Sequence, residues 1–452
     1  MVIAMEKTVN ERTAVVGAGV AGLCTALLLS RQGRPVEVYE RDPDGPADVL
    51  DAGARTRPGA PQTRHPHVFL GLFRKLLIAH LPDVYDDLIA CGVEEVPLAS
   101  PGATPDQVML AARRSVVEWA LRRALDRDGV PYHAGTSVQE IVTSGGAVGG
   151  IRVADDVVPY GLVVDACGAR SRLAPSWTQV VEDVECGKVY NSRFYRLAEG
   201  VTPPPTRYGT VTVVDGLGYG VALFSHDHGS FSIDVGRLPE DEALKDLRDA
   251  SAFSRVLSLF PQFEPWLRPG VSEPVSDVVP MAGLRNVMRT LSPSAPSGYA
   301  PIGDALCVTD PTFGRGAALG LGQAIRLSSA VAAGDPAAGV RENEQWLRPW
   351  YDDVILQDRG RTALWRAAVA DEPLEGILAG LPPNPFMLLD AAEHDPVLAD
   401  ASAQYVNMLS APTMDTPEFR ERVGKLIPVL MTQQMMNPAP SYAEVVKALS
   451  GT

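Results

Sequence analysis

The sequence contains too few cysteines for a disulfide framework and too little positive charge for a nucleic-acid partner. Its 452 residues include five cysteines, an odd number without a CxxC pair, which indicates reduced thiols. Forty Lys and Arg residues are outnumbered by 55 Asp and Glu residues. The net charge of −15 disfavours binding to nucleic acid or to an anionic membrane.

Long apolar runs and targeting segments are also missing. The most apolar stretch, residues 14–29, is shorter than the ~20 residues of a membrane span, and three glycines interrupt it. Residues 1–7 lack the charged, apolar and small-residue regions of a signal peptide. We therefore expect a cytoplasmic protein of two or three lobes without an integral membrane segment.

The strongest pattern that is present is a dinucleotide-binding βαβ unit. A buried strand is predicted at residues 13–16, a helix extends to Ser30, and a second strand at 36–40 ends in an acid. Three glycines in GxGxxG spacing connect the first strand to the helix: Gly17, Gly19 and Gly22. Strand, glycines, helix, strand and acid in register make this signal far stronger than the glycines alone.

Each of these residue types has a physical reason. Gly17 permits the tight turn out of the strand, Gly19 allows the backbone to approach a pyrophosphate, and Gly22 allows the helix to pack close to the sheet. The helix N-terminus offers unpaired N–H groups and a positive dipole end to the phosphates. Glu40 lies where an acid accepts hydrogen bonds from a ribose.

Two later stretches place acids and glycines where buried strands end. Asp165 and Gly168 follow the strand beginning at Leu162, and they are predicted to line a second edge of the nucleotide. Gly303 and Asp304 follow a short strand, and the Asp304 carboxylate is predicted to hold ribitol or ribose hydroxyls. The next turn, Asp310-Pro-Thr-Phe-Gly-Arg-Gly316, precedes an Ala- and Leu-rich helix through about residue 333. Its glycines and the positive helix end suit a flat, anionic reduced flavin.

Other charged and histidine residues leave alternatives open. Arg114, in a helical stretch with basic residues between apolar ones, either belongs to a solvated face or reaches a cofactor phosphate. His65 and His67 resemble a metal pair only in their spacing, and no Cys or acid follows at a usual zinc spacing, so we predict no metal. His226-Asp-His228 is predicted to be a turn between two strands.

The middle of the chain changes character. Residues 189–197, 209–214, 219–225 and 230–235 are predicted to be four antiparallel strands that wall a substrate site. Aromatic residues on or near them would supply apolar surface: Phe194, Tyr195, Tyr219, Phe224 and Phe231. Strand aromatics are nonetheless more often plain core than ligand contacts.

We therefore predict an α/β fold with a Rossmann-like domain of the glutathione-reductase type. This domain comprises residues 1–186 and 277–335, and it is interrupted by a β-sheet substrate domain at 187–276. Residues 336–452 are predicted to be a helical C-terminal region without evident chemistry.

Together, the GxGxxG unit, the Asp165-Ala-Cys-Gly168 turn and the Gly303 to Gly316 segment resemble FAD-dependent monooxygenases of the para-hydroxybenzoate hydroxylase and squalene epoxidase type. The Pro61-Gln-Thr-Arg-His-Pro-His67 segment resembles most the polyene epoxidases of bacterial polyether biosynthesis. Two departures concern Asp165-Ala-Cys-Gly168, where Asp-Gly is usual, and Asp310, which replaces a frequent Asn.

The resemblance implies noncovalent FAD, with Glu40 at the adenosine ribose, Arg114 at the phosphates, Asp304 at the ribityl side and Pro311 to Gly316 at the isoalloxazine. The residues expected to contact the cofactor are Gly17, Gly19, Gly22, Glu40, Arg41, Arg114, Asp165, Gly168, Gly303, Asp304, Pro311, Gly314 and Gly316. NAD(P)H would act as a transient reductant or through a separate flavin reductase, because only one fingerprint of this kind is present.

The expected activity is epoxidation or hydroxylation of a largely hydrophobic natural-product intermediate, as in antibiotic biosynthesis, through a flavin C4a-hydroperoxide formed with O2. The cofactor carries this chemistry, so no catalytic residue is assigned; Arg64, His67 and Arg315 are the polar side chains expected nearest the flavin. Three alternatives remain. They are a reductase resembling geranylgeranyl reductases, a halogenase (although the WxWxIP signature is missing), and a redox-silent flavoprotein that binds a partner.

Overall fold

The first sheet is parallel and lies in the half of the molecule that contains the fingerprint. The computed structural model of the chain describes residues 11–43, 45–54, 57–98, 103–412, 414–436 and 439–451. Five strands have the order β18-β9-β1-β2-β5. They are β1 (Thr13–Val16), β2 (Val36–Tyr39), β5 (Tyr132–His133), β9 (Leu162–Asp165) and β18 (Tyr299–Pro301). Every residue of β1 and β9 is buried, as expected for parallel strands that are covered on both faces.

The two faces of this sheet pack against different layers. Val15 belongs to a core shared with three helices, whereas Ala14 and Val16 belong to a core shared with a small antiparallel sheet. The helices are α2 (Val20–Arg31), α6 (Arg114–Arg127) and α9 (Gly316–Ala332); the strands are β6 (Val138–Ser144), β7 (Ala147–Val153) and β8 (Asp156–Val158). The predicted Rossmann-like α/β domain is therefore confirmed.

A second sheet is antiparallel, with the order β12-β13-β14-β11-β15 and with β16 also paired to β11. Its strands are β11 (Val189–Leu197), β12 (Val211–Asp215), β13 (Tyr219–Ser225), β14 (Ser230–Arg237), β15 (Ser272–Pro274) and β16 (Val279–Met281). The four predicted strands are thus present and antiparallel. One face packs against α7 (Ala250–Leu257), α8 (Glu264–Leu267) and α15 (Tyr442–Ser450).

A short antiparallel ribbon connects the regions of the two sheets. β10 (Thr178–Glu185) pairs with β17 (Arg285–Leu291), which also pairs with β19 (Cys307–Val308). The remaining elements before residue 316 are α3 (Val49–Ala54), η1 (Pro61–Arg64), α4 (Gly71–His80), α5 (Pro82–Ala90), β3 (Glu94–Pro97), β4 (Val108–Ala111), η2 (Lys245–Arg248), η3 (Gly303–Ala305) and η4 (Pro311–Phe313). Helix α3 begins after Asp48, whose carboxylate accepts hydrogen bonds from the amides of Leu50 and Asp51.

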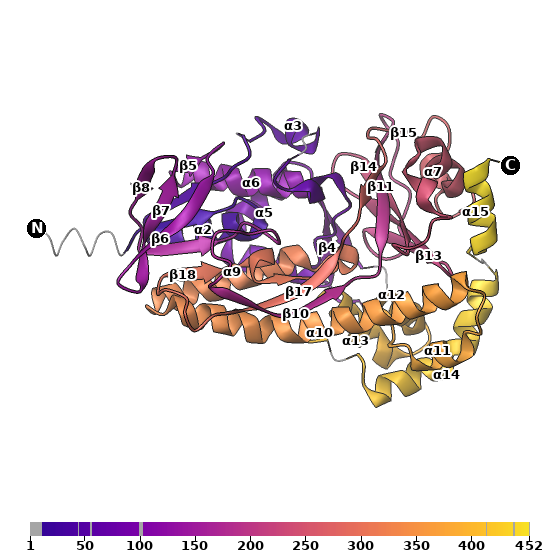
Figure 1. Cartoon of the computed structure of the whole chain (residues 1–452). Coiled ribbons are helices and arrows are strands. Elements are labelled where there is room, and N and C mark those ends of the chain that lie inside the picture. The colour runs from indigo at the N-terminus through magenta and orange to yellow at the C-terminus, as the bar shows by residue number, and fades with distance from the viewer. Residues whose placement is uncertain are drawn as a thin grey trace, which may run out of the picture.

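The C-terminal region is helical, as predicted, and its longest helix runs beneath both lobes in Figure 1. The helices are α10 (Pro336–Val369), α11 (Glu375–Gly380), α12 (Pro385–Ala392), α13 (Pro396–Val406) and α14 (Pro417–Met436). Asp335, Asn384 and Asp395 cap three of them, each followed by a proline in the first turn.

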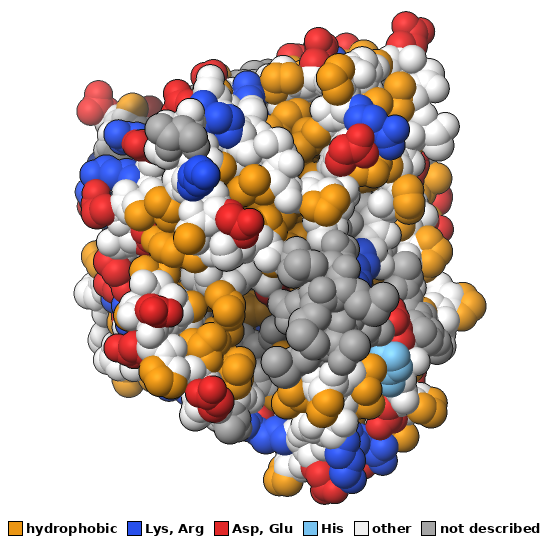
Figure 2. Space-filling view, turned by 90° about the vertical axis from the view of Figure 1, so that its right-hand side faces the viewer, with side chains coloured by type: hydrophobic (Ala, Val, Ile, Leu, Met, Phe, Trp, Pro, Cys, Tyr) orange, Lys and Arg blue, Asp and Glu red, His pale blue; other side chains and the backbone are white. Residues whose placement is uncertain are grey.

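Figure 2 shows the side of the molecule that lies at the right of Figure 1. On the described part of this side, acidic, basic and apolar side chains are interspersed, so it presents no field of a single sign. Among the helices of the described residues, none combines the length and apolar character needed to cross a membrane.

Candidate functional site

A cavity of about 700 Å³ extends from the dinucleotide fingerprint to the second sheet. The β1–α2 turn and the segments 65–70 and 303–317 form its first half. Strands β12, β13 and β14, together with helices α10 and α12, enclose the other end. One continuous space is therefore available for a cofactor and a substrate.

The three fingerprint glycines have the positions that a pyrophosphate cradle requires. Gly17 has φ +105°, and a Cβ there would clash with the Ala166 carbonyl; a Cβ at Gly22 would clash with the Gly17 carbonyl. At Gly19 a Cβ would lie 3.3 Å from Arg114 Nη2 and would fill the space beside the guanidinium. This cradle fits the phosphates of a dinucleotide.

Two helix N-termini lie at this cavity without a side-chain cap. Gly19 precedes α2 and has no side chain, and Arg315 precedes α9 and has no acceptor atom, so neither residue caps its helix. Gly316, the first residue of α9, has open space around its Cβ position, and the preceding Gly314 is left-handed with φ +66°. The free N–H groups and positive dipole ends suit a diphosphate at α2 and an anionic ring at α9.

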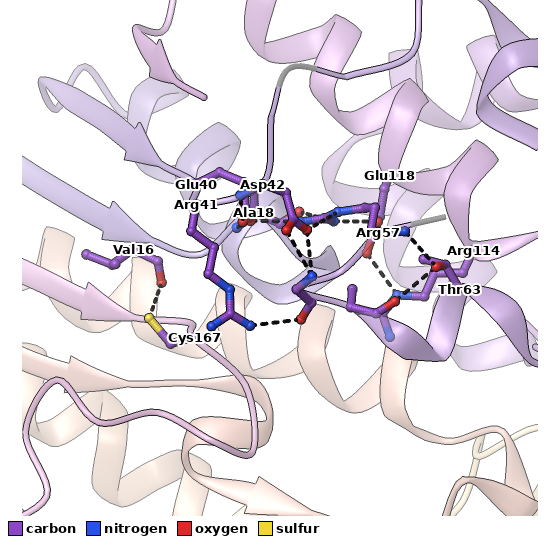
Figure 3. Close-up of polar contacts among 12 residues, drawn as sticks. Val16, Ala18, Glu40, Arg41, Asp42, Arg57, Thr63, Arg114, Glu118 and Cys167 are labelled. Carbon is purple, nitrogen blue, oxygen red and sulfur yellow. Dashed lines mark hydrogen bonds and ion pairs between the residues drawn. The ribbon is translucent and has the colours of Figure 1, made fainter. Parts of the chain in front are cut away.

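Glu40 is the centre of a buried network that Figure 3 shows. Its Oε2 accepts hydrogen bonds from the Ala18 amide and from Arg57 Nη2, both at 2.8 Å, and its Oε1 accepts one from the Asp42 amide at 2.9 Å. Arg57 also forms ion pairs with Asp42 Oδ2 at 3.2 Å and with Glu118 Oε2 at 2.6 Å. Because an ionised carboxylate accepts about four hydrogen bonds, Glu40 keeps one position for a ribose hydroxyl.

Arg57 and Glu118 are residues that the sequence interpretation missed. Burial alone would raise the pKa of Glu118, but the positive charges of Arg114 and Arg57 lower it, so this carboxylate stays ionised. A signal existed for each residue: Arg57 directly precedes the Pro-Gly-Ala-Pro-Gln run, and Glu118 is four positions after Arg114 in one helix.

Two contacts, one made by Arg114 and one made by the residue before it, orient Arg114 toward the cradle. Its Nε donates to Glu118 Oε1 at 2.8 Å, so the Nη groups remain for a phosphate beside Gly19. The preceding Arg113 is held by fully buried Asp227, whose Oδ2 accepts the Arg113 amide at 2.7 Å. The predicted turn at 226–228 therefore connects the second sheet to the start of α6.

The other predicted cofactor residues differ in whether they line the cavity. Gly168 and Asp304 line the cavity, and Arg41 does so at an exposed position. Asp165 is absent from the cavity wall, because its carboxylate accepts hydrogen bonds from the Cys167 amide at 3.1 Å, Ser171 Oγ at 2.6 Å and Tyr299 OH at 3.1 Å. It shapes the turn instead of facing a ligand.

Gly303 and Pro311 are also in the wall of the cavity, and the segment between them leads into a buried acid pair. Asp310 Oδ2 lies 3.0 Å from Arg361 Nη2, which also lies 2.8 Å from Asp358 Oδ1. Burial alone would raise the pKa of Asp310, but Arg361 and a hydrogen bond from Asp358 lower it. Burial and Asp310 raise the pKa of Asp358 to about 8. The pair therefore holds one proton and, with Arg361, is neutral.

Cys186 Sγ lies near these carboxylates, and the three potential metal-ligand atoms are within 4.8 Å of one another. Arg361 already supplies positive charge to this cluster. His65 and His67 do not join it: His65 Nδ1 is 3.0 Å from Ser192 Oγ, and His67 Nδ1 is 3.0 Å from the His65 carbonyl.

Of the three polar side chains expected near the flavin, only His67 lines the cavity without being held in an ion pair. Burial and Arg114 lower the pKa of His67 to about 3, so it is neutral at physiological pH. Arg64 is exposed and outside the cavity wall. Arg315 lines the cavity but is 3% exposed and is paired with Asp353 at 2.6 Å.

The aromatic wall expected on the second sheet is mostly on its other face. Tyr195, Tyr219 and Phe231 are buried in the core with α7, α8 and α15, and Phe194 stacks on His226. Only Phe224 of the five lines the cavity. The period of two along each strand explains the difference, because neighbouring residues point to opposite faces.

The C-terminal region, expected to lack chemistry, contributes to the enclosed end of the cavity. Arg361 and Trp365 of α10, Phe386 of α12 and Val406 of α13 are in the wall. Three charged residues there were also missed: Lys188, Asp215 and Asp234. They follow no motif: the sheet register brings Asp215 and Asp234 together, and Lys188 directly precedes β11.

The parallel sheet, the antiparallel sheet over the cavity and the uncapped helix N-termini define a fold shared with flavin-dependent monooxygenases and halogenases. Residues 15–72 match the family model of an NAD(P)-binding Rossmann-like domain. Protein Rv3254 of Mycobacterium tuberculosis is 26% identical over 444 residues, which cover 86% of this chain and 88% of that protein.

Two solved structures show the same fold at low identity. PqsL of Pseudomonas aeruginosa, a probable FAD-dependent monooxygenase, is 16% identical with a TM-score of 0.61, over 80% of this chain and 99% of that chain. The flavin-dependent brominase Bmp2 is 18% identical with a TM-score of 0.59, over 93% of this chain and 99% of that chain.

Proposed function

We propose that this protein is an FAD-dependent monooxygenase that transfers one oxygen atom from O2 to a small, largely hydrophobic organic substrate. The observation that carries the proposal is the single cavity that joins a dinucleotide cradle to an enclosed, mostly apolar chamber under the second sheet. Epoxidation and hydroxylation of a natural-product intermediate are the two reactions that suit such a chamber.

The chain would hold noncovalent FAD with the residues already described. The N-terminus of α2 and Arg114 would bind the diphosphate, and Glu40 the adenosine ribose. The left-handed turn at Gly314 and the N-terminus of α9 would border the isoalloxazine. When bound, the flavin supplies the activation of O2, and the protein supplies orientation and a dry chamber.

The chain's own contribution to the reaction is positioning and exclusion of water. Phe224, Trp365 and Phe386 enclose the chamber with apolar surface. His67, with its lowered pKa, presents a neutral imidazole to the cavity and therefore adds no charge beside the substrate. The neutral group of Arg361, Asp310 and Asp358 likewise fixes the turn before α9 without adding net charge.

The test is turnover of reduced, FAD-loaded protein under 18-O2 with polyene, terpenoid, aromatic polyketide and small aromatic acid substrates. A monooxygenase places one 18-O atom in the product. A flavin reductase of the geranylgeranyl reductase type saturates the substrate without label, which would overturn the proposal. Label confined to the small aromatic acids would contradict the hydrophobic substrate class.

A halogenase is the second candidate, because the fold is shared with the brominase Bmp2. Bromide and chloride added to the same assays distinguish it. A product that contains halogen and no 18-O would support halogenation instead.

A further inference from the structure

The enclosed end of the cavity has a floor with two adjacent glycines. Tyr190, Gly236, Gly220 and Asp215 are directly opposite one another on β11, β14, β13 and β12, so their Cβ positions point to one face. A Cβ at Gly220 would lie 3.3 Å from Trp365 Cζ2 and 3.7 Å from Asp215 Oδ1. The Asp215 carboxylate and the Trp365 indole therefore converge over the same point of the floor.

Asp215 has no polar partner among the residues that the structure describes. No donor of that part of the chain is within hydrogen-bonding distance of its carboxylate, and no Lys or Arg pairs with it. Asp215 is the last residue of β12; it is exposed, and it lines the cavity. The protein around this carboxylate raises the pKa of Asp215 because it disfavours the charged form, and a positive group beside the carboxylate would offset that effect.

The charges at this end of the cavity do not balance. Arg361 is paired with Asp310 while Asp358 is protonated. Lys188 and Asp234 are each 8% exposed and lie in the cavity wall, and the charge of Lys188 acts on Asp215 and Asp310 as well as on Asp234. Two cations, Lys188 and Arg361, therefore face the three carboxylates of Asp215, Asp234 and Asp310, so one negative charge is in excess at this end of the cavity. An anionic ligand at Lys188 would instead face three carboxylates, those of Asp215, Asp234 and Asp310.

We propose that the corner formed by Asp215, Trp365 and Gly220 binds a protonated amine of the substrate, whose apolar body extends toward the flavin-binding half of the cavity. The carboxylate accepts hydrogen bonds from the ammonium group, the indole stabilises the cation, and Gly220 places no side chain between the two. This assignment rests on the proposed oxygenase function for the identity of the bound molecule as substrate. It makes the substrate an amphipathic amine.

The test measures binding to the FAD-loaded protein by calorimetry at pH 8 with three probes that share one body: 2-(2-naphthyl)ethylamine, 2-(2-naphthyl)ethanol and 3-(2-naphthyl)propanoate. The amine should bind about tenfold or more tightly than the alcohol, and the propanoate most weakly. Asp215→Asn should remove the preference for the amine and leave the alcohol unchanged. Asp246→Asn, an exposed acid of the same lobe, is the matched control.

The pH dependence of amine binding is a second readout, because it reports the protonation of Asp215. The charged groups that act on this carboxylate are Lys188, Arg361 and Asp390. Amine affinity should fall as the pH is lowered in the unmodified protein and stay flat in Asp215→Asn. An alcohol that binds as tightly as the amine, a propanoate that binds best, or an amine preference that survives Asp215→Asn overturns the assignment. Because binding is measured without turnover, an Asp215-dependent amine preference without 18-O transfer would refute the oxygenase and keep the amine site.

Discussion

Arg361 Nη2 lies 3.0 Å from Asp310 Oδ2, and this contact joins the C-terminal helix α10 to the turn that precedes α9. Arg361 also donates to the Cys186 carbonyl at 2.7 Å, at the entrance to the second sheet. One buried guanidinium therefore links three segments that are far apart in sequence, which explains why the C-terminal region belongs to the site.

The first prediction concerns this guanidinium. Arg361→Met should lower the free energy of unfolding by about 3–5 kcal/mol, because it leaves the buried Asp310 carboxylate without its cation. Arg366→Met on the same helix is the control; its ion pair with Glu240 is exposed, so the loss should be at most about 1 kcal/mol. Urea unfolding of both variants measures the difference, and equal losses would contradict the structural role of Arg361.

The second prediction concerns the pyrophosphate cradle. Gly19→Val places a side chain beside Arg114 Nη2, in the space proposed for the diphosphate, so the FAD content of purified protein should collapse. Gly376→Val, at an exposed helical position with open space around its Cβ, should retain full FAD content. The ratio of flavin to protein absorbance gives the result. A Gly19→Val variant with full flavin content would place the phosphate site elsewhere.

The sequence predicted the parts of the fold whose signals are local. Residues 189–197 and 219–225 are strands with the predicted bounds, because alternation and turn residues mark them. The fingerprint glycines were recognisable because their spacing is a local signal, although the atoms that a Cβ at Gly17 or Gly19 would meet belong to the distant Ala166 and Arg114. The face to which each strand residue points was harder to predict, because it depends on what covers the sheet. Tyr195 and Phe231, expected at the substrate site, are core residues for this reason.

The rest of the site depends on contacts between distant segments. Arg57 contacts Glu118, 61 positions away, and Arg361 contacts Asp310, 51 positions away. No local pattern specifies such a partner, so a single sequence shows only that each residue is charged. For Asp165 the local motif was misleading. It suggested a ligand contact, but the carboxylate instead accepts hydrogen bonds from Ser171 and Tyr299.

The third prediction concerns the electron donor. The chain has one dinucleotide fingerprint, and we propose that the cavity associated with it holds FAD, so NAD(P)H would either visit the flavin transiently or be replaced by a separate flavin reductase. Anaerobic stopped-flow mixing of the FAD-loaded protein with NADPH separates these routes. Bleaching of the flavin absorbance on the timescale of turnover supports a transient visit. Bleaching only after addition of a flavin reductase supports the second route.

The last prediction concerns the proton shared by Asp310 and Asp358. Burial and the Asp310 charge raise the pKa of Asp358 from its ordinary 3.8 to about 8 in the folded protein. A carboxyl group with a raised folded-state pKa stabilises the fold fully below the ordinary pKa and loses that contribution as the pH rises through the folded value.

Asp358→Asn cannot lose a proton, and its amide can still face Asn286 and Asp310. The stability of the unmodified protein relative to this variant should therefore decline between pH 6 and pH 9, by about 2–3 kcal/mol. Asp352→Asn, exposed on the same helix, should show a difference that does not change with pH. Urea unfolding at pH 6, 7, 8 and 9 measures all three proteins. If the difference between the unmodified protein and Asp358→Asn stays constant, Asp358 is already ionised in the folded state, and the neutral arrangement of Arg361, Asp310 and Asp358 is wrong.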